Sequence, residues 1–276
     1  MRERAISAVV IAAVVIAVFL AGQPWLTFGL AILAALAAIE VFRLLPPAGF
    51  PVQPLPGVAF PPLAVLAMGL LEPATGWLAL YVAAILIFLA IDGFRRPEVR
   101  DGFLVWLGGS FGALYASLLA FVAAILSVAP EVPDDAPLGA YLDAGRTWLL
   151  VLVLTVWSFD TFAYLAGRTF KKGRFLDHIS PNKTWSGVIG GTVAAVVVGG
   201  LLAWAAGQWL PGGLVMGLLV AVAGQAGDVA ESMLKRTAGA KDSGHLIPGH
   251  GGILDRVDSF LFAAPVVFGY LIVIGA

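Results

Sequence analysis

Long apolar runs, separated by short polar or Pro- and Gly-rich breaks, make up most of this 276-residue chain. Hydrophobic residues account for 60% of the sequence and charged residues for only 12%, which excludes an ordinary soluble domain. A membrane-spanning helix needs about 20 mostly apolar residues, and the runs lack the alternation of barrel strands. We therefore predict an all-α, polytopic integral membrane protein. Its nine expected spans lie at approximately 5–21, 25–42, 58–71, 75–91, 103–128, 147–166, 185–209, 212–230 and 259–274.

The basic residues predict the orientation of these spans, because loops rich in Lys and Arg stay on the cytoplasmic side. With the N-terminus in the cytoplasm, nine alternating spans place fifteen of the sixteen Lys and Arg residues inside. Only Arg146 falls outside, in an acidic loop. Losing one span midway would invert every later loop, so the charge bias supports the number of spans as well as the orientation. We expect a multi-pass protein of the cell (inner) membrane.

The chain is expected to divide into two functional regions. Residues 1–102 have few charges and Pro-rich breaks, which indicates a scaffold of transmembrane helices. Residues 103–276 form the expected catalytic region, with cytoplasm-facing segments at 167–185 and 228–258. The absence of cysteine excludes disulfides and thiolate metal sites.

The first polar feature of the second region is Asp160, which lies inside an apolar run. Tyr164 and Gly167 follow it on the same helical face. Carboxylates at membrane depth are costly and usually functional, so a purely structural aspartate is the less favoured interpretation. The next loop is basic and contains the turn Ser-Pro-Asn-Lys-Thr at 180–184. A helix N-terminus beside a lysine suits phosphate, whereas membrane anchoring explains the basic count but not this compact turn.

The densest polar cluster runs from Asp228 to Asp258, where aspartates, histidines, Lys and Arg surround a Gly-rich stretch. Its first part predicts a stripe along one helical face with spacing i, i+3, i+4 and i+7. This stripe consists of Asp228, Glu231, Ser232 and Lys235. The Gly-rich loop lacks the spacing of a Walker loop, but its backbone can approach a ligand closely. A flexible connector is the alternative interpretation.

Asp255 and Asp258 lie three residues apart where the last span begins. Together with Asp228 they are suited to Mg²⁺, which prefers one or two carboxylates, water and substrate phosphate oxygens. A salt bridge to Arg256 or Lys241 is the alternative for Asp255. Zinc is disfavoured, because the histidines lack cysteine partners and a tight spacing. Carboxylates, cations and a glycine loop together favour phosphoryl or nucleotidyl transfer.

The segment 228–258 contains three ordered runs, Ser-Met-Leu-Lys-Arg from Ser232, Lys-Asp from Lys241, and Pro-Gly-His-Gly-Gly-Ile-Leu-Asp-Arg-Val-Asp ending at Asp258. Together these runs resemble the signature of the phosphatidate cytidylyltransferase family, also called CDP-diacylglycerol synthases. The turn at 180–184 and the helix around Asp160 also resemble family features. One departure is Ser186, where the family often has Glu.

The resemblance implies that CTP and phosphatidate become CDP-diacylglycerol and pyrophosphate, with the lipid phosphate attacking the α-phosphorus of CTP, in phospholipid biosynthesis. It implies Mg²⁺ as cofactor, with K⁺ as a second cation. The implied catalytic residues are Asp228, Asp255, Asp258, Lys241 and Arg256. The implied substrate-binding residues are Lys183, Ser180, Asn182, Ser232, Lys235, Arg236, Asp242, Gly249, His250, Gly251 and Gly252. The implied metal ligands are Asp228, Asp255 and Asp258, with Asp160 as an additional candidate.

The expected partners are CTP, phosphatidate and membrane lipid, with no nucleic acid, and a homodimer is one assembly that the sequence leaves open. Two other functions fit part of the pattern. A CTP-dependent polyprenol or phytol kinase, or an ether-lipid CDP-alcohol synthase, would apply related chemistry to another lipid. A cation-coupled transporter would bind its ion with the aspartates, but the charges gather at the cytoplasmic ends of the later spans and not at a midplane break.

Overall fold

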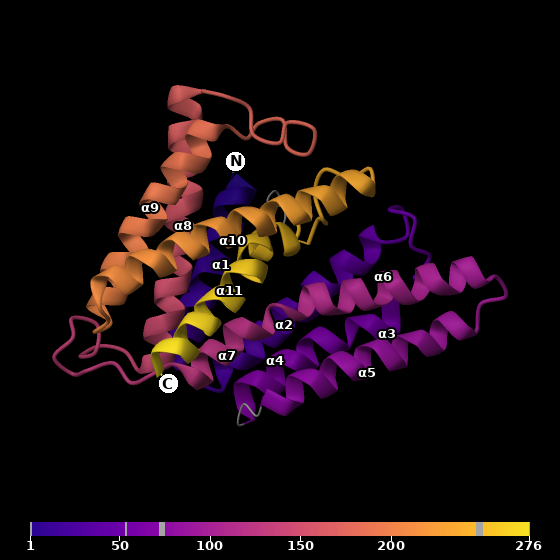
Figure 1. Ribbon diagram of the computed structural model, residues 1–276, viewed down its shortest axis with the longest axis horizontal. Helices are drawn as coiled ribbons and strands as arrows, with labels where there is room; N and C mark the ends of the chain where they lie inside the picture. Colours follow the sequence, from indigo (N-terminus) through magenta and orange to yellow (C-terminus); the bar gives the residue numbers. More distant parts are fainter. Residues whose placement is uncertain (1, 53, 72–74, 247–250, 276) are drawn as a thin grey trace. The chain divides into compact units, whose positions relative to one another are not determined.

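The computed structural model describes residues 2–52, 54–71, 75–246 and 251–275, and helices are the only extended regular elements within these ranges (Figure 1). The predicted all-α fold is therefore confirmed. The helices are α1 (Arg2–Ala21), α2 (Trp25–Leu44), α3 (Pro54–Val58), α4 (Phe60–Leu70), α5 (Thr75–Phe94), α6 (Val99–Ser117), α7 (Ala120–Val128), α8 (Ala144–Phe170), α9 (Trp185–Ala205), α10 (Leu210–Thr237) and α11 (Leu254–Gly275).

Each predicted apolar span coincides with a helix or with two consecutive helices. In the described residues, six segments are long and apolar enough to cross a membrane, namely α2, α6 with α7, α8, α9, α10 and α11. Shorter apolar helical stretches lie at Ala12–Ala21, Leu55–Leu70 and Leu78–Phe94. Two helices continue into the polar segment, because α10 ends only at Thr237 and α11 begins at Leu254. The two ends of the segment 228–258 thus lie on helices, and its middle forms a loop.

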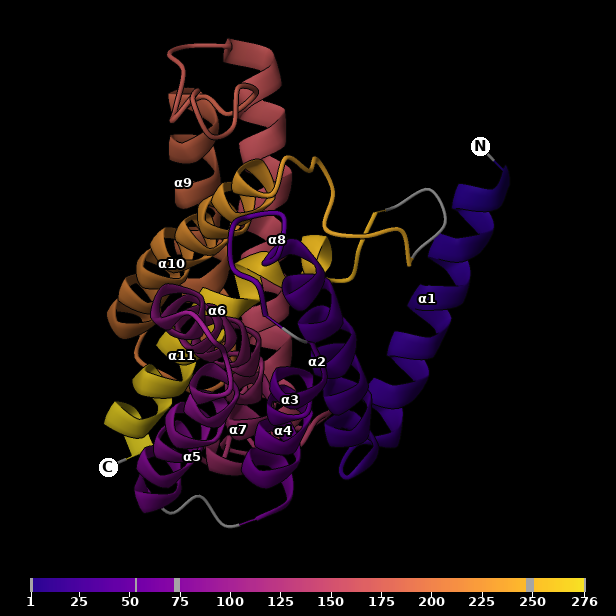
Figure 2. The same cartoon turned by 90° about the vertical axis from the view of Figure 1, so that its right-hand side faces the viewer.

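One compact unit consists of the residues up to Ala124 together with Met233–Val257. Within it, α2 packs against α4 and α6, and α5 runs beside α6 (Figure 2). Phe42 and Leu45 are buried at the end of α2, where Gly112 of α6 lies close to the Phe42 ring and to a methyl group of Leu45. The segment Met233–Val257, which carries most of the signature, therefore packs with the apolar N-terminal helices.

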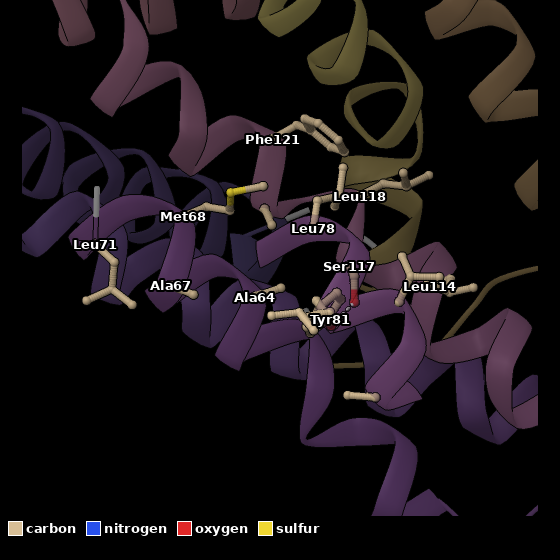
Figure 3. Close-up of a pocket in the computed structure, with 14 residues that line it drawn as sticks. Ala64, Ala67, Met68, Leu71, Leu78, Tyr81, Leu114, Ser117, Leu118 and Phe121 are labelled. Atoms are coloured by element: carbon tan, nitrogen blue, oxygen red, sulfur yellow. Dashed lines mark hydrogen bonds between the residues drawn. The ribbon is translucent and has the colours of Figure 1, made fainter. Parts of the chain in front are cut away.

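This unit contains an apolar cavity of about 490 Å³, lined by α4, α5, α6 and α7 (Figure 3). Met68, Leu114 and Phe121 are among its lining side chains. Tyr81 and Ser117 contribute hydroxyl groups that hydrogen-bond to each other at 2.6 Å. None of the lining residues is charged, so this cavity is unsuited to phosphate groups. The polar clusters described below are the better candidates for chemistry.

The second unit consists of Ile125–Ser232 together with α11 from Asp258 onward. Here α8 and α9 lie side by side (Figure 1), and Phe159, Ala195 and Ala221 form a buried contact among α8, α9 and α10. Thr184 caps α9 by accepting a hydrogen bond from the Gly187 amide at 3.1 Å. Such a cap satisfies one of the free N–H groups at a helix start.

Gly227 marks a close approach between α10 and α11. A Cβ atom at this position would collide with the backbone carbonyl of Asp258, so we expect Gly227→Ala to destabilise the fold by about 1–3 kcal/mol through overpacking. The thermal midpoint of the purified protein in detergent measures this effect. Gly269→Ala in α11 is the matched control, since nothing lies within 4 Å of its added methyl group. Equal midpoints for the two variants would contradict the close approach.

Candidate active site

The signature segment Asp228–Asp258 occupies the second half of α10, the following loop and the start of α11. Along α10, Glu231 and Ser232 are buried, with exposed fractions of 1% and 7%. Asp228 and Lys235 are partly exposed. The four residues of the predicted stripe therefore lie on one helix. The two middle residues are buried, and the two outer residues are accessible to solvent.

Asp255 is the centre of a hydrogen-bonded group that we call the loop cluster, consisting of Lys235, Ser243, Gly252 and Asp255. The Lys235 ammonium group lies 2.6 Å from Asp255 Oδ1. Asp255 Oδ2 accepts hydrogen bonds from the Gly252 amide at 2.8 Å, the Ser243 amide at 3.0 Å and the Ser243 hydroxyl at 2.9 Å. The sequence offered Arg256 or Lys241 as a salt-bridge partner of Asp255, and the salt bridge described here is formed by Lys235.

Glu40, on α2, contacts the same loop. Its carboxylate accepts hydrogen bonds from the Ser243 hydroxyl at 2.8 Å, the Ile253 amide at 3.0 Å and the Leu254 amide at 2.8 Å. The side chain is fully buried. A carboxylate from an apolar helix thus satisfies free N–H groups at the beginning of α11.

A second group of charged residues, the helix cluster, consists of Asp160 on α8, Lys183 before α9 and Asp228 on α10. Lys183 Nζ lies 2.6 Å from Asp228 Oδ2, with both side chains partly exposed. Asp160 interacts electrostatically with both of the other residues. The helix cluster thus combines two carboxyl groups with one ammonium group.

The basic loop between α8 and α9 folds into a compact turn that places Lys183. An isolated antiparallel bridge joins Arg174 to Thr184, and the Phe175 amide donates to the Lys183 carbonyl at 2.9 Å. Ser186 takes part in the same turn, with its hydroxyl 3.1 Å from that of Thr184. At the position where the family often has Glu, this chain therefore has a serine whose hydroxyl group contacts that of Thr184.

Most of the remaining predicted site residues that the structure describes are exposed or partly exposed. Lys241, Asp242 and Arg256 are exposed, and Asp258 Oδ1 accepts a hydrogen bond from the Ser259 amide at 2.7 Å. Other predicted substrate-binding residues lie in accessible loops or helix ends, namely Ser180, Asn182, Arg236 and Gly251. Gly249 and His250 lie outside the described residues.

A divalent metal ion can bind only where carboxylates or other ligand side chains lie close together. No group of three or more His, Cys, Asp or Glu side chains is arranged around a common metal position in the described part of the chain. Mg²⁺ needs fewer protein ligands, because substrate phosphates and water complete its shell. In the helix cluster, Asp160 and Asp228 supply two carboxyl groups, and in the loop cluster Asp255 Oδ1 is paired with Lys235.

The comparisons with known proteins agree with the chemistry of these clusters. The model of the cytidylyltransferase family matches residues 2–274. The chain belongs to this family. It is 40% identical over 210 residues to the phosphatidate cytidylyltransferase of Brucella abortus biovar 1 (strain 9-941), a match that covers 70% of this chain and 71% of the relative. It is 33% identical over 203 residues to that of Rickettsia typhi (strain ATCC VR-144 / Wilmington), covering 69% and 86%.

A further relative in the family is the phosphatidate cytidylyltransferase of Bacillus subtilis (strain 168), 43% identical over 126 residues, or 45% of this chain and 47% of the relative. The resemblance inferred from the signature is therefore confirmed, and the family match extends through the N-terminal helices as well. Glu40 lies in that N-terminal part and was not predicted as a site residue. Its signal was a single carboxylate within the apolar run 25–42, a position that favours function.

Proposed function

We propose that this cytidylyltransferase transfers the cytidylyl group of CTP to phosphatidate. An oxygen of the lipid phosphate forms a bond to the α-phosphorus of CTP, the bond from that phosphorus to the bridging oxygen breaks, and pyrophosphate leaves. The products are CDP-diacylglycerol and pyrophosphate. The observation that carries the proposal is the family match over residues 2–274, supported by relatives named phosphatidate cytidylyltransferase.

The two clusters have the side chains that this reaction needs. We propose that Lys183 in the helix cluster and Lys241, Arg236 and Arg256 near the loop cluster bind phosphate oxygens, because phosphate contacts and electrophilic stabilisation both require cations. Both reactants are anions, so these cations also offset the repulsion between the lipid phosphate and the triphosphate.

Asp160 and Asp228 are the proposed holders of Mg²⁺. When bound, the ion would supply charge neutralisation on the triphosphate and the leaving pyrophosphate. In the helix cluster, Lys183 orients Asp228 through the 2.6 Å ion pair. In the loop cluster, Lys235 and the backbone amides orient Asp255.

We further propose that the chain crosses the cell (inner) membrane nine times, with its N-terminus and both clusters on the cytoplasmic side. The distribution of Lys and Arg supports this orientation, since fifteen of sixteen fall on that side. The helices that match the nine predicted spans support the number of crossings. CTP would then reach the site from the cytoplasm and phosphatidate from the bilayer.

The products of purified protein test the proposed reaction. With CTP labelled at the α-phosphorus and phosphatidate in mixed micelles, we expect label in CDP-diacylglycerol and one pyrophosphate for each lipid formed. Release of CDP with label-free lipid would instead indicate a CTP-dependent kinase. Polyprenol, phytol and an ether-lipid phosphate serve as competing acceptors, and turnover of one of these without turnover of phosphatidate would contradict the proposal. Cation uptake into protein-loaded vesicles without nucleotide would indicate a transporter.

A further inference from the structure

Glu40 is a fully buried carboxylate on α2, an apolar helix long enough to span a membrane. A charge in such a helix costs several kcal/mol unless it is paired or hydrogen-bonded. No cation is paired with Glu40 in the described residues, and its carboxylate instead receives one hydroxyl and two backbone N–H groups. The cost of burying the charge is thus offset by contacts that all belong to the signature segment.

The two amides belong to Ile253 and Leu254, at the point where α11 begins. The first N–H groups of a helix have no partner within the helix and favour a negative charge. Glu40 therefore acts as a cap supplied by another helix. It fixes the position of the first turn of α11. It thereby also fixes the direction in which the side chain of Asp255, the next residue, points.

The loop has been shaped around the Glu40 side chain. A Cβ atom at Gly244 would lie 2.5 Å from Glu40 Oε1, and a Cβ atom at Gly252 would collide with both Glu40 Oε2 and the Ser243 hydroxyl. Only glycine allows the backbone to approach this closely at either position. The close approach of the Glu40 carboxylate thus accounts for glycine at two positions of the loop.

Ser243 connects Glu40 to Asp255. Its hydroxyl oxygen lies 2.8 Å from Glu40 Oε2 and 2.9 Å from Asp255 Oδ2. A hydroxyl has one proton to donate, so it can donate to only one of these carboxylates at a time. The Ser243 amide holds Asp255 Oδ2 independently at 3.0 Å. Moving Ser243 would therefore change two of the contacts that orient Asp255.

We propose that Glu40 is a positioning residue for the reaction: it holds Ser243 and the first turn of α11 so that Asp255 keeps its orientation beside Lys235. This role rests on the proposed function, because it assigns Asp255 to the reacting site. It extends the site to a helix that the signature does not contain.

Glu40→Gln tests the role with little change in shape. Glutamine has one acceptor oxygen, and its NH₂ group would face an N–H donor of α11, so the loop loses its fixed geometry. We expect kcat to fall about 10- to 100-fold, the usual effect of removing an outer partner of a site carboxylate. KM for CTP should stay within about twofold, since Glu40 does not touch substrate. Thr27→Val, which removes another buried polar group of α2, is the control and should retain wild-type kcat.

Ser243→Ala provides the second arm of the test. If Glu40 acts through the loop, the losses in the double variant should be clearly smaller than the product of the two single losses. If Glu40→Gln does not fold, a tenfold or greater fall in kcat for Ser243→Ala supports the role, and an unchanged kcat overturns it. Wild-type kcat in folded Glu40→Gln also overturns it, as does a loss that Thr27→Val reproduces. Wild-type protein that makes no CDP-diacylglycerol would instead refute the proposed function.

Discussion

Replacing Asp255 with Asn is expected to lower kcat by at least about 10²- to 10³-fold, the scale of losing a well-placed electrostatic group at a reacting centre. The change removes the negative charge that lies 2.6 Å from the Lys235 ammonium group. It also replaces one acceptor oxygen with an NH₂ donor, although Oδ2 accepts hydrogen bonds from the Ser243 amide, the Ser243 hydroxyl and the Gly252 amide. Both the charge balance and the loop geometry are lost together.

Steady-state turnover of labelled CTP by the Asp255→Asn variant measures this loss, with the thermal midpoint in detergent recorded alongside. Asp92→Asn is the matched control, because Asp92 forms an ordinary i,i+4 pair with Arg96 at 3.6 Å, and pairs of that kind contribute little. The control should keep wild-type turnover. Retained activity in Asp255→Asn would show that Asp255 takes no part in the reaction and serves only to hold the loop through hydrogen bonds.

Replacing Asp228 with Asn is expected to raise the Mg²⁺ concentration needed for half-maximal activity by about tenfold or more, and to lower kcat by about 10²-fold. In the proposed magnesium site, removing one of the two carboxylates would leave Asp160 as the remaining charged ligand, and the binding of hard cations depends on the number of ligand charges. Lys183 also loses its partner at 2.6 Å. Chelation of divalent cations should abolish activity in the wild-type protein, and added Mg²⁺ should restore it.

A Mg²⁺ titration of activity measures this shift, and Asp177→Asn is its control. Asp177 lies in the same basic loop as Lys183, pairs with Arg174 at 3.7 Å and is largely exposed. Its neutralisation should leave the Mg²⁺ dependence unchanged, which separates a ligand effect from a general change in surface charge. An Asp228→Asn variant with lower kcat but wild-type Mg²⁺ dependence would assign Asp228 to orienting Lys183 instead of binding the ion.

The helices of this chain could be predicted because hydrophobicity alone specifies them in a membrane. The apolar runs at 25–42 and 185–209 correspond to α2 and α9 with nearly the same starting residues. The ends of the helices were harder to predict. Both α10 and α11 include charged residues beyond the apolar runs, because capping and tertiary contacts provide partners for those residues. The breaks within 58–71 and 103–128 depend on local backbone geometry that apolar composition does not reveal.

The candidate site could be predicted as a segment but not as a set of contacts. Spacing placed Asp228 and Lys235 on one helix and Asp255 at the start of another. The partners of these residues lie far along the chain, as with Lys183 and Asp228 or Lys235 and Asp255. Such pairings depend on how helices pack, which a single sequence does not specify. Glu40 was missed because its partners are 203 to 214 residues away.

The cap that Glu40 provides for α11 has a consequence for biosynthesis. The three groups that satisfy Glu40 are synthesised more than 200 residues after α2. Until then, an apolar helix enters the membrane with an unsatisfied carboxylate, at a cost of several kcal/mol. Synthesis of the signature segment relieves that cost. The same contact that orients the loop therefore also makes the stability of α2 depend on a segment that is made much later than the helix itself.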